Sequence, residues 1–247
     1  MIRDRFLRAL ESPTGIEWTH RLPREAPVVP GDFLVELVRG KRIAHLGFVD
    51  EHLLEAKLAS GHWLHARLAN VAAETVGIDI EPEGVAWAFE QGYEAYVADC
   101  QNRESLAGLA LDPFEIVVAG EVIEHLEAPG SFLRASHELV EPGGRIVVTT
   151  PNAAALQSFA APLLGVELIH PDHLALFSPR TLAALFERTG WDVERIVYYQ
   201  RPPKPERATG VSGRVLALGR KGVAAALRRW PYWADGIVVV ATSRRPG

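Results

Sequence analysis

The sequence predicts an α/β fold in which helices cover a doubly wound, mainly parallel sheet of seven strands. Apolar runs rich in β-branched residues recur along the chain, and patterns typical of helices lie between them. With 247 residues and 48% apolar side chains, the chain can bury one sizeable core. We therefore expect a single α/β domain.

The expected strands are the apolar runs at residues 42–46, 75–80, 94–98, 114–119, 145–150, 192–199 and 236–242. Helical patterns lie at residues 51–70, 82–91, 129–140 and 178–189. The last helix has a clear beginning and end, because Ser178 can cap it, Pro179 suits its first position and Gly190 follows it. Strands that alternate with helices in this way favour parallel pairing.

The segment before the first strand differs from the rest of the chain. Residues 1–40 contain several prolines and no sustained period, so we expect a leader that packs on the sheet or covers its mouth. The domain itself would span residues 41–247. At about residues 202–234 we expect an insertion that begins as a Pro/Gly-rich loop and continues as a basic amphipathic helix.

This insertion lies in the most basic part of the chain. The whole sequence has a net charge of −5, yet residues 201–247 contain ten Lys/Arg against two Asp/Glu. Arg214, Lys221 and Arg228 recur every seven residues on one side of the expected helix. Such a face suits peripheral contact with a membrane or a lid over a substrate, and it equally suits a helix docked on the sheet. Nucleic acid is not an expected partner, and the oligomeric state stays open.

Nothing in the sequence indicates export. Cys100 is the only cysteine, which excludes an intramolecular disulfide, and no stretch approaches the roughly 18 apolar residues of a membrane span. The first residues, Met-Ile-Arg-Asp-Arg-Phe, lack the long apolar region of a signal peptide. We therefore expect a cytoplasmic protein.

Three residues mark the ends of the first three expected strands. Gly47 ends the first, where the missing side chain lets a ligand approach the backbone closely. Asp79 ends the second, where a carboxylate can accept both hydroxyls of a ribose. Asp99 ends the third, where it can meet an adenine amino group. A strand-end Asp can also serve as a helix cap, but one such residue per successive strand favours a nucleoside site.

A polar cluster follows the fourth expected strand. Glu121, Glu124 and His125 have the i, i+3, i+4 spacing that places side chains on one face of a helical turn. They could therefore converge on one small object, at the edge where an open α/β sheet binds its ligands. The spacing alone leaves open whether this object is a cofactor, a metal ion or a substrate hydroxyl.

Taken together, these motifs resemble the class I S-adenosylmethionine-dependent methyltransferases over roughly residues 40–200. The most specific parts are Glu124-His125-Leu126 and the Pro142-Gly143-Gly144 turn before the fifth strand. The resemblance implies a Rossmann-like sheet with an antiparallel last strand, a cofactor along the strand tips, and methyl transfer to a nucleophile. The implied cofactor contacts are Gly47 and Gly120 beside the methionine moiety, Asp79 at the ribose and Asp99 at the adenine, with Ile80, Cys100 and Glu121 completing the set.

The first motif departs from the pattern of this family. Where the family usually shows an acid and three glycines as D-x-G-x-G-x-G, this chain has His45 at the acid position and Val49 and Glu51 at two glycine positions. Only Gly47 remains. Bulkier residues would narrow the approach to the backbone, and the lost carboxylate removes a possible partner for the amino acid end of the cofactor. His45 is either a ligand or a satisfied core histidine.

The Glu121-x-x-Glu124-His125 motif also resembles that of the ubiquinone-pathway O-methyltransferases and the small-RNA 2′-O-methyltransferases, whose matching residues bind a divalent ion. The resemblance implies a fourth metal ligand from a downstream histidine, for which His173 is in the corresponding place. A bound cation would acidify the acceptor hydroxyl. Without an ion, His125 or His173 could act as general base beside Glu124, or the Glu-His pair could only cap the turn after the fourth strand.

The leading hypothesis is an S-adenosylmethionine-dependent methyltransferase that acts on a hydroxyl of a small molecule, glycan or lipid-linked precursor. A catalytically idle relative that uses the same fold for binding or scaffolding is the alternative, because the glycine motif is degraded. A nicotinamide-dependent dehydrogenase would need a glycine fingerprint at the start of the first helix, and Phe48-Val49-Asp50 offers none.

Overall fold

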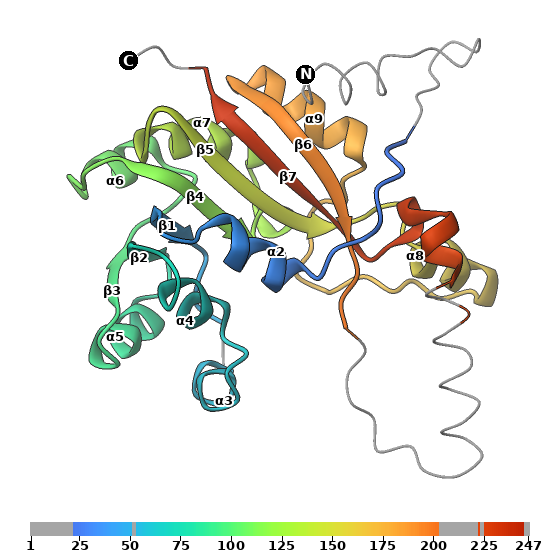
Figure 1. Cartoon of the computed structure of the whole chain (residues 1–247), viewed down its shortest axis with the longest axis horizontal. Coiled ribbons are helices and arrows are strands. Elements are labelled where there is room, and N and C mark those ends of the chain that lie inside the picture. Colours follow the sequence, from blue (N-terminus) through green and yellow to red (C-terminus); the bar gives the residue numbers. More distant parts are fainter. Residues whose placement is uncertain (1–21, 51–52, 203–221, 223–224, 245–247) are drawn as a thin grey trace.

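The computed structural model describes residues 22–50, 53–202, 222 and 225–244, and Figure 1 shows them as one twisted sheet with helices on both faces. The sheet has seven strands in the order β3-β2-β1-β4-β5-β7-β6. They are β1 (Arg42–Leu46), β2 (Glu74–Asp79), β3 (Glu94–Val97), β4 (Phe114–Gly120), β5 (Val140–Pro151), β6 (Trp191–Tyr199) and β7 (Gly236–Ser243).

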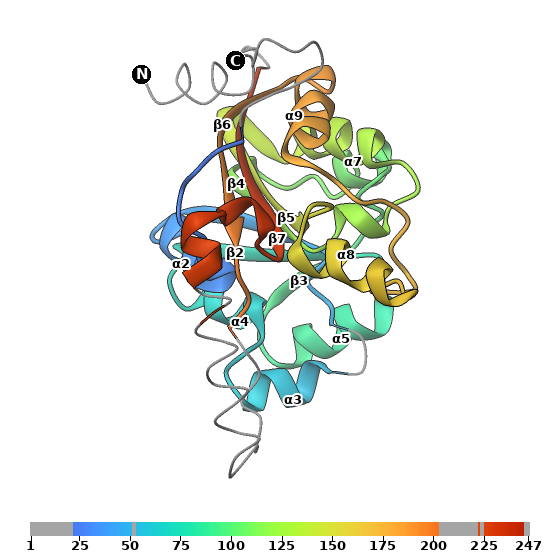
Figure 2. The same cartoon turned by 90° about the vertical axis from the view of Figure 1, so that its right-hand side faces the viewer.

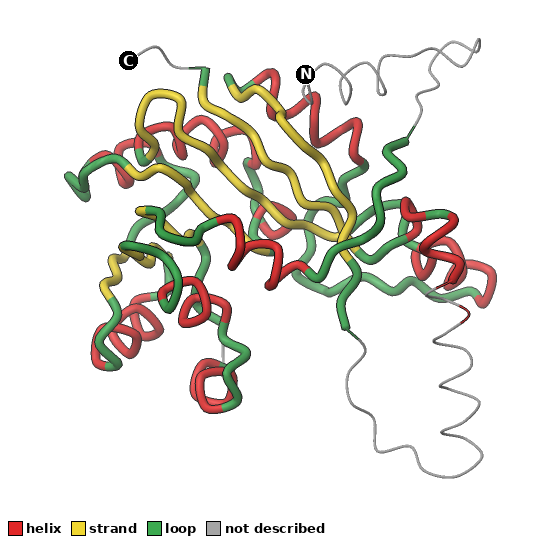
Figure 3. Tube along the Cα trace, viewed as in Figure 1, coloured by secondary structure: helices red, strands yellow, loops and turns green. Residues whose placement is uncertain are grey.

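Strand direction confirms the predicted sheet. Neighbours among β1 to β5 pair in parallel, whereas β7 runs antiparallel to both β5 and β6. The chain order reverses between β1 and β4, which lie side by side in the middle of the sheet (Figure 3). Ligands of open α/β sheets bind outside the carboxyl ends of the strands at such a reversal. This edge is therefore the place to look for a site.

Helices cover the two faces of the sheet in separate layers, as the turned view in Figure 2 shows. One face carries α2 (Pro30–Leu37), α3 (Leu54–Ala59), α4 (Leu64–Ala69) and α5 (Pro82–Glu90). The other carries α6 (Arg103–Ala107), α7 (Pro129–Ala135) and α9 (Pro179–Arg188). Side chains alternate between these layers along each strand, so that Ile43 packs towards α2 and Ala44 towards α7.

The described part of the leader is attached to the sheet. Helix α2 begins at Pro30 and packs through Leu34 against the apolar residues beneath α4. Ahead of it, Val28 donates its backbone N–H to the carbonyl of Tyr198 at 2.9 Å and accepts from Gln200 N–H at 2.9 Å. These contacts hold residues 22–38 beside the carboxyl end of β6.

Two of the predicted helices are wrong in their extent. The helix predicted at residues 51–70 is broken into α3 and α4, because Gly61 between them has a left-handed φ of +70° that no helix continues through. The helix predicted at residues 129–140 ends with α7, and a single 3₁₀ turn, η2 (Ser136–Glu138), leads directly into β5.

Several short elements had no clear signal in the sequence. They are helices α2, α6 and α8 (Leu156–Ala160) and the 3₁₀ turns η1 (Ile123–His125), η3 (Ala161–Leu164) and η4 (Pro231–Trp233). Most of them have one or two turns, which is too short for a hydrophobic period to show. Helix α8 and η3 project from the sheet with the loop that returns to residue 177 (Figure 1).

The predicted ends of α9 are confirmed. Ser178 Oγ accepts from the backbone N–H of Thr181 at 3.2 Å, while Thr181 Oγ1 accepts from the backbone N–H of Ser178 at 2.9 Å. This reciprocal capping box satisfies two N–H groups that the first helical turn leaves unpaired. Gly190 follows the helix with a φ of +90°.

Most of the basic insertion lies outside the described residues, including Arg214 and Lys221. Residues 225–229 are helical, with Leu227 buried and Arg228 exposed. Contact of these basic residues with a membrane stays a prediction. Among the described residues, no helix has both the length and the apolar character needed to cross a membrane.

Substitution Ser178→Ala should destabilise the protein by about 1 kcal/mol, because it removes one partner of the capping box at α9. Urea unfolding followed by circular dichroism measures this loss. Ser158→Ala, inside α8, is the matched control and should leave the midpoint within experimental error. Equal midpoints for wild type and Ser178→Ala would contradict the role given to the cap.

Candidate functional site

Gly47 lies at the tip of β1 in a conformation that requires glycine. Its φ is +64°, and its N–H donates to the carbonyl of Ile78 at 2.9 Å. A Cβ at this position would lie 2.3 Å from Cγ2 of Val122. The tip of β1 therefore packs closely against the loop after β4, and the backbone of Gly47 is the surface that a ligand at this edge would meet.

Asp79 at the tip of β2 holds two loops by backbone hydrogen bonds. Its Oδ2 accepts from Val49 N–H at 2.8 Å and its Oδ1 from Glu81 N–H at 3.1 Å. Burial raises the pKa of Asp79, and these N–H groups act in the opposite direction. Each carboxylate oxygen has two lone pairs, so each keeps one for a ligand hydroxyl. Asp79 fits a ribose while it fixes the loop after β1.

The tips of β2 and β3 offer an apolar surface beside further acceptors. Ile80 is 65% exposed although it is a branched apolar residue, which fits the flat face of an adenine. Asp99 accepts from Gln101 N–H at 2.8 Å through Oδ1. Burial raises the pKa of the Cys100 thiol to about 12, so Cys100 stays neutral and packs. These residues can accommodate the expected nucleoside.

His45, at the position of the family's acid, pairs with another histidine in the core. It is 2% exposed, and its Nδ1 lies 3.2 Å from Nδ1 of His65. Burial lowers the pKa of both imidazoles, to about 4 for His65 and well below its usual range for His45. One neutral ring therefore donates and the other accepts. The arrangement favours a satisfied core histidine over a ligand.

Val49 replaces a glycine of the family pattern without blocking the backbone of Gly47. A Cβ on Gly84, in the first turn of α5, would lie only 2.4 Å from Cγ1 of Val49. Gly84 therefore supplies the space that the Val49 side chain needs. Glu51, the other replaced glycine, lies outside the described residues.

Glu121 follows β4 in a strained conformation. Its φ is +56°, which is unusual for a residue with a side chain. The carboxylate accepts hydrogen bonds from the Thr149 hydroxyl at 2.9 Å, from the Tyr199 hydroxyl at 2.8 Å and from the guanidinium of Arg201. The Glu121 side chain is thus held by one donor on β5, one on β6 and one just after β6.

Tyr199 and Arg201 were missed by the sequence reasoning. Tyr199 is buried, and its ring lies against the backbone of Gly236, where a Cβ would come within 1.9 Å of Cζ. Arg201 follows two residues later, and its guanidinium lies over the Tyr199 ring at 5.7 Å. In the sequence they appear only as a Tyr-Gln-Arg end to the sixth strand. That pattern does not show that Arg201 pairs with Glu121, 80 residues away.

Glu124 is fully buried, and neither of its carboxylate oxygens has a hydrogen-bond partner among the described residues. Burial, followed by the nearby charge of Glu121, raises the pKa of Glu124 to about 8. Its backbone carbonyl accepts from Leu174 N–H at 2.8 Å and from Ala175 N–H at 3.1 Å. These bonds bring the loop that carries His173 to the tip of β4.

His125 and His173 lie beside this carboxyl group, with ring centroids 4.7 Å apart. Nδ1 of His125 is 3.1 Å from the carbonyl oxygen of Asp172, which can only accept, so Nδ1 carries the proton and Nε2 is left as a base. The pKa of His173 is lowered by burial and by the neighbouring histidines.

Glu124, His125 and His173 each offer one ligand atom, and these atoms lie within 4.8 Å of one another. A buried carboxylate without a partner and two imidazole nitrogens fit a divalent cation. We call these residues the Glu–His–His set. Glu121 lies outside it, because Thr149, Tyr199 and Arg201 already bind its carboxylate. A metal role for Glu121 stays a prediction.

An apolar cavity of about 380 Å³ lies between the α8 segment and the residues before β7. It is lined by Leu156, Ala160, Leu164, Val166, Leu227 and Trp233, with Gln200 and Asp235 at a polar side. The backbone N–H of Arg201 donates to Asp235 at 3.1 Å, which connects this cavity to the residues around Glu121. An apolar body with a polar end would fit here.

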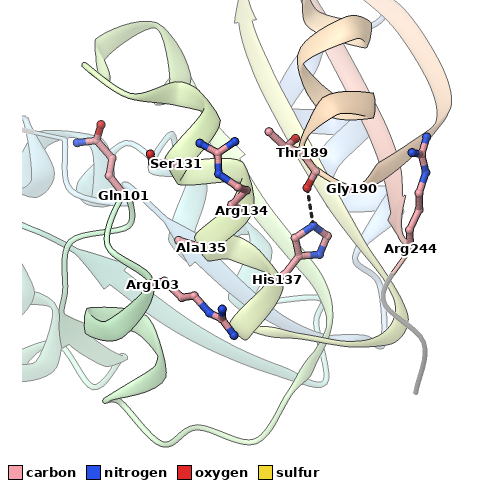
Figure 4. Close-up of a pocket in the computed structure, with 9 residues that line it drawn as sticks. All are labelled: Gln101, Arg103, Ser131, Arg134, Ala135, His137, Thr189, Gly190 and Arg244. Atoms are coloured by element: carbon pink, nitrogen blue, oxygen red, sulfur yellow. Dashed lines mark hydrogen bonds between the residues drawn. The ribbon is translucent and has the colours of Figure 1, made fainter.

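Figure 4 shows a second cavity, of about 530 Å³, in the helix layer formed by α6, α7 and α9. Three arginines line it. Arg103 donates to Glu138 at 2.8 Å. Arg244, near the amino end of the parallel strands, donates to Asp192 at 2.6 Å. Two of its three positive charges are thus paired. The cavity approaches the strand tips through Gln101, whose N–H donates to Asp99 at 2.8 Å.

Comparisons with known proteins show what this chain is similar to. A family model described as "Methyltransferase domain" matches residues 35–196. A ubiquinone biosynthesis O-methyltransferase from Aeromonas salmonicida is 31% identical over 162 residues, which are 61% of this chain and 63% of that relative. A protein of the same name from Azorhizobium caulinodans is 34% identical over 111 residues, or 44% of each.

Among solved structures, a SAM-dependent methyltransferase from Archaeoglobus fulgidus superimposes with a TM-score of 0.54 and 19% identity, covering 86% of this chain and 90% of that one. This likeness is one of fold. The chain spans less than two thirds of the length of the two curated relatives. The family match includes the strand tips and the Glu–His–His set, whereas Tyr199 and Arg201 lie beyond its end.

The buried pair of His45 and His65 should make the protein less stable in acid. Both have a lowered pKa, so below about pH 6.5 the unfolded chain takes up protons that the folded protein excludes. The free energy of unfolding should therefore fall as the pH drops towards 4, by roughly 1 kcal/mol per pH unit for each histidine. Urea unfolding between pH 7.5 and 5 measures this.

Variants separate this effect from other titrating groups. Glu124 acts in the opposite direction, because its raised pKa makes the folded state hold a proton that the unfolded chain loses above about pH 4.5. The double variant His45→Leu, His65→Leu should lose much of the acid sensitivity, whereas His62→Gln, at an exposed histidine, should keep it. The same pH dependence in the double variant as in wild type would rule out a neutral buried pair.

Proposed function

The chain belongs to the methyltransferase domain family, and on that premise we propose that it transfers the methyl group of S-adenosylmethionine to a hydroxyl group. The observation that carries this proposal is the placement of Gly47, Asp79 and Asp99 at the tips of β1, β2 and β3, where the sheet order presents them side by side. When bound, the cofactor supplies an electrophilic methyl group on a sulfonium.

The residues of the strand tips would bind and orient this cofactor. Asp79 has a free lone pair on each oxygen for the ribose hydroxyls, and Ile80 offers an apolar face to the adenine. Gly47 leaves its backbone accessible to the methionine moiety. Because Asp79 is held by two N–H groups, its carboxylate is oriented before a ligand arrives, which lowers the entropic cost of binding.

Hydroxyl activation is the proposed role of the residues after β4. When Nδ1 of His125 donates to the carbonyl of Asp172, Nε2 of the neutral ring can accept the proton of an acceptor hydroxyl, with His173 as the alternative base. The Glu–His–His set would hold a divalent ion, which would supply acidification of the same hydroxyl. Glu121 would act at the cofactor rather than in proton transfer, since its carboxylate is already bound by three donors.

The acceptor that fits the structure best is a small molecule with an apolar body. The 380 Å³ cavity is mainly apolar, and its polar side adjoins Arg201. Exposed apolar side chains continue outside it along the α8 segment, among them Phe159 and Leu163. The names of the curated relatives support O-methylation. A lipid-linked precursor would match these surfaces, whereas a bare glycan would use less of them.

Calorimetric titration with S-adenosylhomocysteine tests the cofactor site. Wild type should bind it, and Asp79→Asn should weaken binding by about tenfold or more, because a charged acceptor of two hydrogen bonds is lost. Asp112→Asn, at an exposed acid before β4, is the control and should bind like wild type. No binding by wild type, with or without a divalent ion, would refute the proposed function.

Substitution Glu124→Gln tests the Glu–His–His set. The raised pKa of Glu124 keeps its carboxyl mostly protonated at pH 7, so the amide should leave the stability of the metal-free protein within about 1 kcal/mol of wild type. It should abolish binding of Mn²⁺ or Zn²⁺ measured by equilibrium dialysis. Asp172→Asn, at an exposed acid of the same loop, should retain it. If wild type binds neither ion, the imidazoles alone remain as bases.

A further inference from the structure

Arg201 forms an ion pair with Glu121, and the proposed chemistry gives Arg201 no role. The guanidinium of Arg201 donates to Glu121 through Nη2, and the same nitrogen lies 3.3 Å from the Tyr199 hydroxyl. Arg201 lies beyond the stretch matched by the family model. The pair is therefore a feature of this chain that neither the strand-tip motifs nor the family match accounts for.

The pair lies at the end of the site where the methionine part of the cofactor is expected. Glu121 directly follows Gly120 at the tip of β4, and β4 pairs with β1, which ends at Gly47. The charges of Glu121 and Arg201 both act on His173, so the pair also lies near the Glu–His–His set. A ligand group bound by the pair would lie between the nucleoside site and the acceptor side.

The amino acid end of the cofactor carries an ammonium and a carboxylate on one carbon. An Arg–Glu pair is complementary to such a zwitterion, because each member can exchange its partner for the ligand's opposite charge. The Arg–Glu pair would be replaced by two ion pairs, Glu with the ammonium and Arg with the carboxylate, so every charge stays compensated. The loss of an acid at position 45 makes a second source of negative charge near the amino acid end more important.

Both side chains are arranged for this exchange. Thr149 and Tyr199 bind Oε1 of Glu121, so the carboxylate stays in place when Arg201 leaves Oε2. The Arg201 side chain is 57% exposed, and within the described residues its Nε and Nη1 donate no hydrogen bond. A guanidinium with donors to spare can bind a carboxylate in bidentate fashion.

We propose that Glu121 binds the ammonium and Arg201 the carboxylate of the cofactor's amino acid end. The inference rests on the proposed function, because it assigns residues to the cofactor of that reaction. It makes Arg201 a binding residue supplied by the segment after β6. It also explains the strained backbone of Glu121, because that conformation directs the carboxylate towards Tyr199 and Arg201.

Two probes that differ only at the amino acid end test this assignment. S-adenosylhomocysteine carries both charged groups, whereas 5′-methylthioadenosine keeps the nucleoside and the thioether and lacks them. Titration calorimetry should show that Arg201→Gln weakens binding of the first about 10- to 100-fold and leaves binding of the second unchanged. Arg201→Lys should fall between wild type and Arg201→Gln, because lysine keeps the charge without the fork.

Arg195→Gln is the matched control, since Arg195 lies on β6 and pairs with Glu25 at the surface. This variant should bind both probes like wild type. Equal affinity of Arg201→Gln and wild type for S-adenosylhomocysteine would overturn the inference. So would an equal loss for both probes, which would show a general disturbance of the site. If wild type binds neither probe, the proposed function fails and the inference fails with it.

Discussion

The carboxylate of Glu121 ties three strands together at the edge where the site lies. It follows β4, accepts from Thr149 on β5 and Tyr199 on β6, and pairs with Arg201 beyond β6. The cost is a left-handed backbone at a residue with a side chain, of the order of 1 to 3 kcal/mol. The bonds to three donors offset that cost, so the geometry of the site depends on them.

The same carboxylate contributes to the pKa of a neighbouring acid. Glu124, three residues on, is enclosed without a hydrogen-bond partner among the described residues, and burial together with the charge of Glu121 raises its pKa. Two acids of one short segment thus lie in different environments, because three donors bind the carboxylate of Glu121. Glu121 suits a cationic ligand group, whereas Glu124 holds its proton until a cation or a base draws it away.

Regular local patterns made the strands predictable. The site was less predictable, because its side chains pair across segments that are far apart in the sequence. Buried parallel strands read as β-branched runs, so their positions were found, as was the capping box at Ser178. The break at Gly61 was missed because one glycine within a helical pattern does not show its φ. The pairing of His45 with His65, and of Glu121 with Arg201, depends on packing between distant segments that composition and spacing do not record.

The uncharged pair of His45 on β1 and His65 has a consequence for the proposed reaction. S-adenosylhomocysteine lacks the methyl group of S-adenosylmethionine and, with it, the positive charge of the sulfonium. With both histidines neutral, the position that the family usually fills with an acid carries no negative charge to distinguish the two compounds. On the proposed function, the loss of the sulfonium charge would therefore weaken the attraction of the cofactor to the tip of β1 only a little.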